Sequence, residues 1–225
     1  MVELGKIQRP NAEDYSGKKK LYCVANIYTI HDAADDYKNL VSKYWDEVAQ
    51  QIEKIEAAGK INKIFCELIS EKGDEEMKFL AHMNDRIAEI IARKKEEGGT
   101  LIPLEDREIL GPYTDWGNCL RVVFTKEVFM KVLEFYNDLS QKRLDKIINV
   151  INSNLAEKEA GLLIMKDEDR AKLQFPKDIE VFLITPPSYD DLMRWIRDQY
   201  TMKKSEETEK EKEKDSGGSK GGASG

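Results

Sequence analysis

Short apolar runs alternate along the chain with longer segments of helical periodicity. Five runs are apolar without a three- or four-residue spacing: 20–30, 63–69, 100–104, 161–165 and 178–185. Their length and their β-branched and aromatic content predict β-strands, and the first of them, "KLYCVANIYTI", is typical of a strand buried on both faces.

Apolar residues between these strands recur in steps of three and four, which predicts amphipathic helices. One helix follows Asp32 and ends at Gly59, and a second runs from Asp74 to Gly98. A third helix of about 30 residues follows Thr125, with a break expected near Ser140, and a last one follows 186–187. The charged stretch "IPLEDREILGPYTDWGNC" (102–119) is expected to be a connection between a strand and a helix.

The alternation of strands and helices predicts an α/β fold. We expect a single three-layer domain in residues 20–202, with a mostly parallel sheet of about five strands flanked by helices. Only about a dozen polar residues separate the last two strands, so we expect the last strand to be antiparallel or at an edge. Residues 1–19 are expected to be a polar lead-in, and the charged, Gly/Ser-rich segment 203–225 to be a disordered tail.

Composition narrows the classes of function. The formal net charge is -7, and such an acidic surface disfavours nucleic acid as a partner. No apolar run reaches the roughly 18 residues that a membrane span needs, and the N-terminus lacks the apolar segment of a signal peptide. The three cysteines are far apart and are expected to be reduced thiols. These features predict a cytoplasmic protein without a membrane partner.

Acidic residues follow three of the predicted strands. Glu67 closes the second strand, Glu105 and Asp106 follow the third, and Glu168 follows the fourth. Ligands of open α/β sheets bind beyond the carboxyl ends of parallel strands, so we expect these four carboxylates to cluster there. They are candidate general bases or ligands of Mg²⁺ or Mn²⁺, with at least one raised pKa unless an arginine or a cation neutralises them.

Other polar and aromatic residues near the same edge are candidate binding residues. They are His31, Arg107, Asp115, Trp116 and Arg170. Each also has a structural interpretation: a tryptophan as a core anchor, an aspartate as a cap, a histidine at a helix start. The same holds for the glutamate at the end of the second strand, which could simply pair with a lysine or an arginine.

Several familiar catalytic and binding motifs do not occur in the sequence. The turn after the first strand, "TIHDAADD", has no glycine and several acids, which disfavours nucleotides and dinucleotides. There is no G-x-S-x-G motif, and two histidines with separated cysteines do not make a zinc site. The strands ending at Glu67 and at "MKDEDR" resemble the TraB and ChaN group of α/β proteins. That group carries a histidine where this chain has Arg170, and no activity is carried over from it.

Three functions are compatible with the sequence. The leading hypothesis is a non-catalytic binding or regulatory module, because the motifs of the common enzyme classes are missing. The alternative is a divalent-metal-assisted hydrolase that uses the carboxylate cluster. The third is a structural partner in a homo-oligomer that associates through an aromatic-rich helix surface.

Overall fold

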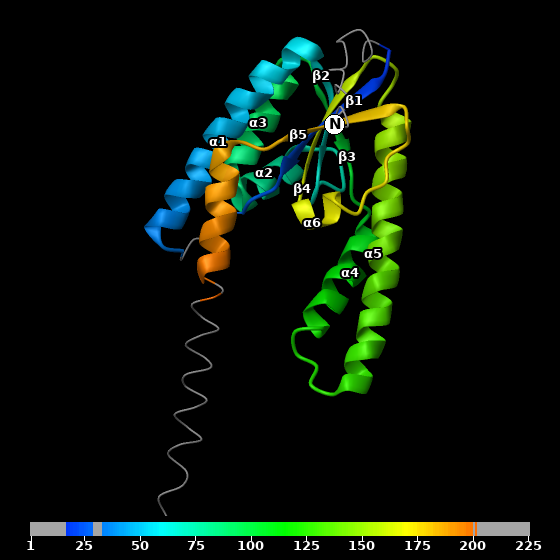
Figure 1. Ribbon diagram of the computed structural model, residues 1–225. Coiled ribbons are helices and arrows are strands. Elements are labelled where there is room, and N and C mark those ends of the chain that lie inside the picture. Colours follow the sequence, from blue (N-terminus) through cyan, green and yellow to red (C-terminus); the bar gives the residue numbers. More distant parts are fainter. Residues whose placement is uncertain (1–16, 29–32, 200, 202–225) are drawn as a thin grey trace, which may run out of the picture. The chain divides into compact units, whose positions relative to one another are not determined.

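The computed structural model describes residues 17–28, 33–199 and 201. It contains a five-stranded sheet in the order β3-β2-β4-β1-β5 (Figure 1). The strands are β1 (Lys19–Ala25), β2 (Ile61–Cys66), β3 (Thr100–Pro103), β4 (Ala160–Met165) and β5 (Ile179–Ile184). Every pair of neighbouring strands is parallel, which confirms the α/β fold class.

The expectation of an antiparallel last strand is wrong. β5 pairs with β1 in parallel, with Cys23 opposite Leu183, and it lies at an edge of the sheet. The connection 166–178 contains only the short helix α6 (Asp167–Arg170) and otherwise irregular backbone. About a dozen residues can return along a six-residue strand without a full crossover helix, because extended chain spans about 3.3 Å per residue.

The helices differ from expectation in three places. Besides α6, the helices before β5 are α1 (Asp35–Ile55), with a 3₁₀ turn η2 (Glu56–Ala58), then α2 (Asp74–Met83), α3 (Asp85–Glu96), α4 (Arg107–Cys119) and α5 (Lys126–Asn154). The single helix expected after Asp74 is two helices, because the extended residue Asn84 ends α2 and caps α3 by accepting a hydrogen bond from the Ile87 N–H. The break expected near Ser140 is absent: α5 is continuous over 29 residues.

The charged stretch that we expected to be a connection is mostly helix α4. Asp106 begins it by accepting a hydrogen bond from the Glu108 N–H at 3.0 Å. Pro112 lies within the helix, where proline is usually unfavourable. Packing of α4 against α5 supplies the stability that local propensity lacks.

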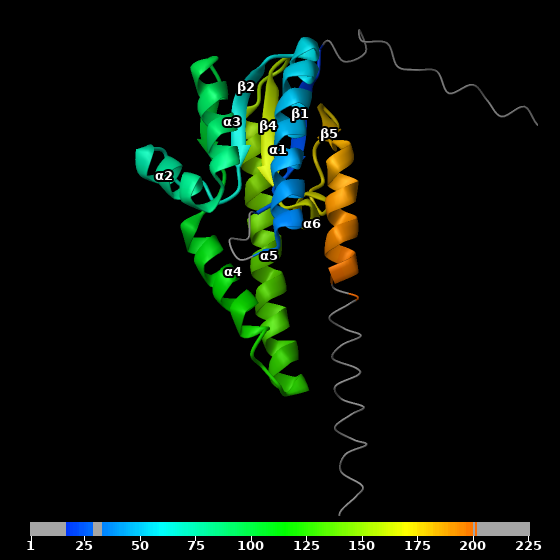
Figure 2. The same ribbon diagram turned by 90° about the vertical axis from the view of Figure 1, so that its left-hand side faces the viewer.

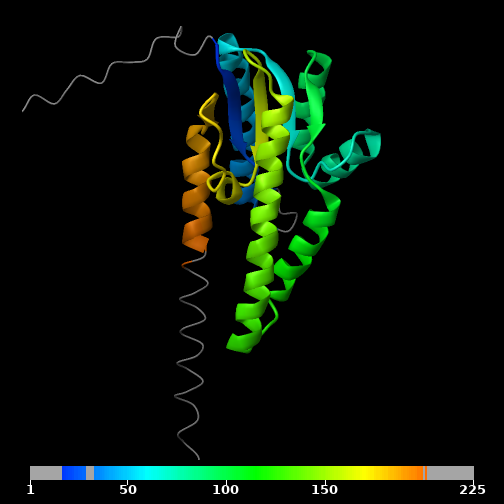
Figure 3. The ribbon, with the colours of Figure 1, turned by 90° about the vertical axis from the view of Figure 1, so that its right-hand side faces the viewer.

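Helices cover both faces of the sheet. α5 packs on one face through Leu144, Ile147 and Ile151, which meet strand residues such as Phe65 and Leu163 in one buried cluster (Figure 3). α3 lies on the opposite face beside the end of α1 (Figure 2), and Lys94 of α3 forms an ion pair with Glu56 at 2.6 Å. This is the layered arrangement that the alternation of elements predicts.

The chain divides into two compact units. Of the described residues, the first unit contains 17–28 and 48–185, and therefore the whole sheet, and the second contains 33–47, 186–199 and 201. In the second unit a helix over 187–199 packs on the start of α1, where Trp195 Nε1 donates to Asp36 at 2.6 Å and Ser188 Oγ donates to Glu47 at 2.6 Å. The expected tail 203–225 and most of the expected lead-in 1–19 lie outside the described residues.

Candidate functional site

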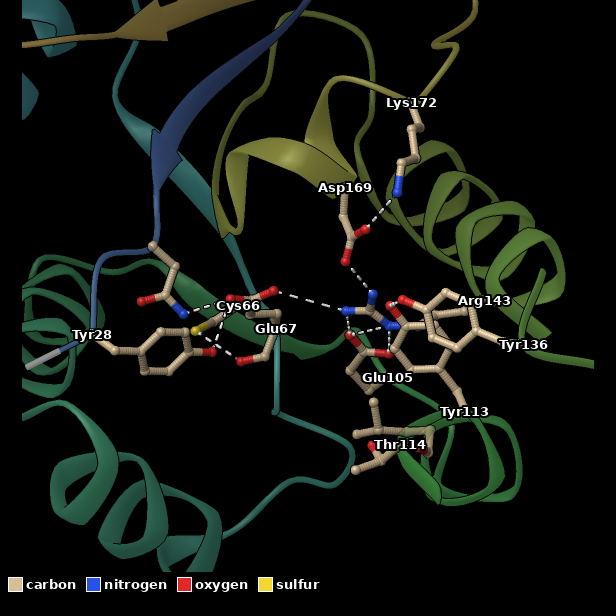
Figure 4. Close-up of polar contacts among 12 residues, drawn as sticks. Tyr28, Cys66, Glu67, Glu105, Tyr113, Thr114, Tyr136, Arg143, Asp169 and Lys172 are labelled. Atoms are coloured by element: carbon tan, nitrogen blue, oxygen red, sulfur yellow. Dashed lines mark hydrogen bonds and ion pairs between the residues drawn. The ribbon is translucent and has the colours of Figure 1, made fainter. Parts of the chain in front are cut away.

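A buried arginine lies at the carboxyl edge of the sheet, surrounded by three carboxylates (Figure 4). Arg143 Nε donates to both carboxylate oxygens of Glu105 at 3.0 Å, and Nη1 donates to Asp169 Oδ2 at 2.7 Å. Its Nη2 lies 3.8 Å from Glu67 Oε2. We call Arg143, Glu67, Glu105 and Asp169 the arginine cluster.

The parallel fold brings these residues together. Glu67 follows β2, Glu105 follows β3, and Asp169 lies in α6 directly after β4, so all three carboxylates reach the same edge. α5 crosses this edge and places Arg143 among them (Figure 4). All four residues are at least nine-tenths buried. Charges at such depth require close partners, because removing them from water is costly.

Glu67 has the most crowded environment in the cluster. Its Oε1 accepts hydrogen bonds from Asn26 Nδ2 at 2.6 Å and from the Tyr28 hydroxyl at 3.0 Å. Burial nevertheless raises the pKa of Glu67, and the opposing hydrogen bonds and the charge of Arg143 do not offset it. Asn26 Oδ1 is buried without a hydrogen-bond partner among the described residues. Burial therefore favours the protonated form of Glu67.

Two other members of the cluster, Asp169 and Arg143, have pKa shifts that favour their charged forms. Burial acts to raise the pKa of Asp169, but the hydrogen bond and the charge of Arg143 outweigh it and the pKa is lowered. Burial likewise acts against the charge of Arg143, yet the hydrogen bonds and charges of Glu105 and Asp169 raise its pKa. The guanidinium of Arg143 thus lies between the carboxyl groups of Glu105 and Asp169.

Aromatic rings connect the cluster to α4. The Tyr113 ring centroid lies 5.2 Å from Arg143 Cζ. Tyr113 stacks on Tyr136 of α5 at 4.8 Å between ring centroids, and their hydroxyls are 2.8 Å apart. Arg143, which pairs with the carboxylates at the edge of the sheet, therefore also contacts the Tyr113 ring that packs α4 against α5.

Two of the four predicted catalytic candidates lie in the cluster. Glu67 and Glu105 converge as expected, but Asp106 turns away, caps α4 and lies 3.5 Å from Lys146 Nζ. Glu168 is exposed, and its neighbour Asp169 points inward instead. A four-residue helix exposes some positions and buries others, and the sequence did not show which acid of "KDEDR" would face the sheet.

The predicted binding candidates do not form one site. Arg107 is on the surface, in ion pairs with Glu71 and Glu76. Arg170 pairs with Asp167 within α6, and Asp115 is exposed on α4. Trp116 stacks on Phe135 at 4.9 Å, which is a structural contact of α4 with α5. His31 lies outside the described residues.

Arg143 was not among the residues predicted from the sequence, although a signal was present. Arg143 continues the apolar spacing of Tyr136, Leu139 and Ile147 along α5, so it occupies a position on the face that packs inward. A charge in such a stripe indicates a buried partner, and the acids after the strands were the candidates.

The geometry differs from that of a carboxylate metal centre. The guanidinium of Arg143 occupies the middle of the cluster, where a shared cation would have to lie. Among residues 17–28, 33–199 and 201, no group of three His, Cys, Asp or Glu side chains is placed to hold a metal ion. The arrangement resembles a structural charge network more than a catalytic metal site.

Comparisons with family models, with curated proteins and with solved structures gave no match. In the part of the chain that the structure describes, no helix is long and apolar enough to cross a membrane.

Proposed function

We propose that the protein is a non-catalytic binding module whose binding surface is the hairpin formed by α4, the following turn and the first half of α5. We call residues 107–139 the hairpin. It extends beyond the carboxyl edge of the sheet (Figure 1), and none of the thirteen residues of α4 is buried. The single observation that carries the proposal is the large apolar surface that the hairpin exposes.

Large apolar side chains are concentrated at the end of the hairpin. Phe124 is 99% exposed, Val122 66% and Met130 54%. Val128, Phe129 and Phe135 are each more than a third exposed. Contiguous exposed apolar side chains of this kind mark interaction surfaces, whereas single scattered ones are ordinary.

The first half of α5 exposes apolar residues beside its polar face. The segment "VFMKVLEFY" (128–136) has only two charged residues, and Lys126, Glu127, Lys131, Glu134 and Asp138 share one side of the helix by its 3.6-residue period. Val128, Phe129 and Met130 are exposed although they are apolar. This exposure supports a second surface that covers them.

The arginine cluster supports this function as an anchor. Arg143 fixes α5 to the sheet edge and contacts Tyr113 of α4, so the hairpin is held firmly at its base. A firmly held helical surface loses little conformational entropy when it binds, which favours affinity. The metal-assisted hydrolase lacks comparable support, because the guanidinium lies where the cation would be needed.

A site-specific cross-linking experiment tests the proposal. A photo-reactive phenylalanine analogue at position 124 of the full chain should give a discrete covalent adduct in an extract of the producing cells. The same analogue at Phe79, which is 48% exposed on α2, is the matched control and should not. Met130→Glu should abolish the adduct, and Met83→Glu on α2 should leave it unchanged. An absence of adducts from position 124, or equal adducts from both positions, would overturn the proposal.

A further inference from the structure

We propose that the partner covering the hairpin is a second copy of this chain, with the two α5 helices antiparallel and Met130 on the two-fold axis. This inference rests on the proposed function, and it adds the identity of the partner and the register of the interface. In this register residue i of one copy lies opposite residue 260 − i of the other.

The contact is built on one stripe of α5. Lys126, Met130 and Glu134 are four residues apart and all are exposed, so they form a continuous ridge on the helix surface. Phe129 and Leu133 flank this ridge, at 37% exposure and partial burial respectively. The ridge thus has an apolar centre with one positive and one negative end.

The charge order of the ridge is complementary to itself. Glu134 Oε2 pairs with Lys131 Nζ at 2.7 Å within its own chain. Antiparallel pairing about Met130 places Lys126 of each copy opposite this Glu134 of the other, so that each Glu134 lies between two lysines and two equivalent ion pairs join the copies. The same pairing brings Arg121 and Lys126 of one copy toward Asp138 of the other. An unrelated partner would not require this symmetry, and electrostatic complementarity of this kind sets the register of an interface.

The exposed area is sufficient for a dimer. The exposed parts of Val122, Phe124, Phe129 and Met130 amount to on the order of 500 Å² per copy, on the scale of about 150–250 Å² for a whole aromatic side chain. Two copies would bury on the order of 1,000 Å² before the charged side chains are included, which is about the lower bound of a specific interface. A shallow hollow lies on the flank of the ridge away from Phe129. It is lined by Glu127, Val128, Met130, Lys131, Val132 and Glu134.

A charge-exchange experiment on the purified full chain tests this arrangement. Sedimentation equilibrium should show a wild-type dimer at micromolar concentration. Lys126→Glu should raise the dimer Kd at least tenfold, because it places like charges opposite each other twice, and Glu134→Lys should do the same. The double variant should bring the Kd back to within about threefold of wild type. Lys142→Glu, an exposed change outside the ridge, should leave the Kd unchanged.

Recovery in the double variant must come from contacts between copies. Residues 126 and 134 are separated by about 12 Å along one helix, which exceeds the screening length of about 10 Å at 0.1 M salt. A monomeric wild type, or a dimer that the double variant does not restore, would overturn the inference. If position 124 still cross-links to a protein of different mass, the proposed function stands with another partner. If no adduct forms either, both proposals fail.

Discussion

The two halves of α5 belong to one unbroken helix and have opposite surroundings. In the second half, Leu144, Ile147 and Ile151 are buried against the sheet. In the first half, Phe129 and Met130 are exposed, although this half is at least as apolar. The difference shows that periodicity predicts a helix without showing what covers it. Arg143 marks the boundary, because it is the residue at which α5 reaches the edge of the sheet.

Removal of the boundary residue should have the largest effect on stability. Arg143→Met retains the unbranched apolar stem of the side chain but leaves Glu105 and Asp169 buried without their cation. We expect a loss of about 3–5 kcal/mol in the free energy of unfolding, measured by urea denaturation, as for other buried ion pairs that lose one partner. Lys142→Met, at an exposed neighbouring position, should change it by less than about 0.5 kcal/mol. Equal effects of the two substitutions would show that the cluster does not anchor α5.

A matched pair of truncations compares the two halves directly. Ile147 is fully buried, so Ile147→Ala should cost about 2–5 kcal/mol through the cavity it leaves. Met130→Ala should change the unfolding free energy by less than about 0.5 kcal/mol, measured below the concentration at which the chain associates. A large cost at Met130 under those conditions would show that the first half of α5 is covered within a single chain.

The sequence was sufficient to predict the layers and most of the sheet. Strand runs such as "GLLIM" are short and apolar, so their burial on both faces was readable, and the order of elements implied parallel pairing. The expectation that the last strand is antiparallel is wrong, because a polar connection of about a dozen residues is long enough for a parallel return, whereas the alternative of an edge position is confirmed. The chain between β4 and β5 returns to the start of the sheet with α6 as its helix, and β5 then runs parallel to β1.

The candidate site was only partly predictable. The positions of Glu67 and Glu105 followed from the parallel topology alone, because each residue follows a strand and the carboxyl ends of parallel strands share one edge of the sheet. Arg143 could not be assigned as their partner, because it lies 38 residues from Glu105 and its position depends on how α5 crosses the sheet. Helix α4 was missed because Pro112 and the glycines around it are typical of a loop, and only its packing on α5 overrides that preference.

The smallest expected effect is a pH dependence that isolates Glu67 from the rest of the cluster. Its pKa in the folded chain is raised above the usual value of 4.5, whereas the pKa of Asp169 is lowered below the usual 3.8. Between pH 4.5 and the folded pKa of Glu67, the folded chain binds more protons than the unfolded chain. Stability contributed by Glu67 therefore falls as pH rises through this window. The contribution of Asp169 has the opposite sign, and it is lost only as pH falls below 3.8.

Glu67→Gln separates the two contributions, because it removes one titration and leaves Asp169 in place. Urea unfolding of both proteins between pH 4 and 8 should show the wild type losing stability relative to Glu67→Gln as pH rises above 4.5. The difference should grow by about 1.4 kcal/mol for each pH unit between the unfolded and folded pKa values and should then level off. Parallel curves would mean that the pKa of Glu67 is the same in the folded and the unfolded chain, so that its hydrogen bonds and Arg143 offset the effect of burial. An opposite slope would mean that Arg143 stabilises the Glu67 carboxylate more than burial disfavours it, which would make all three carboxylates equal members of the anchor beneath the hairpin.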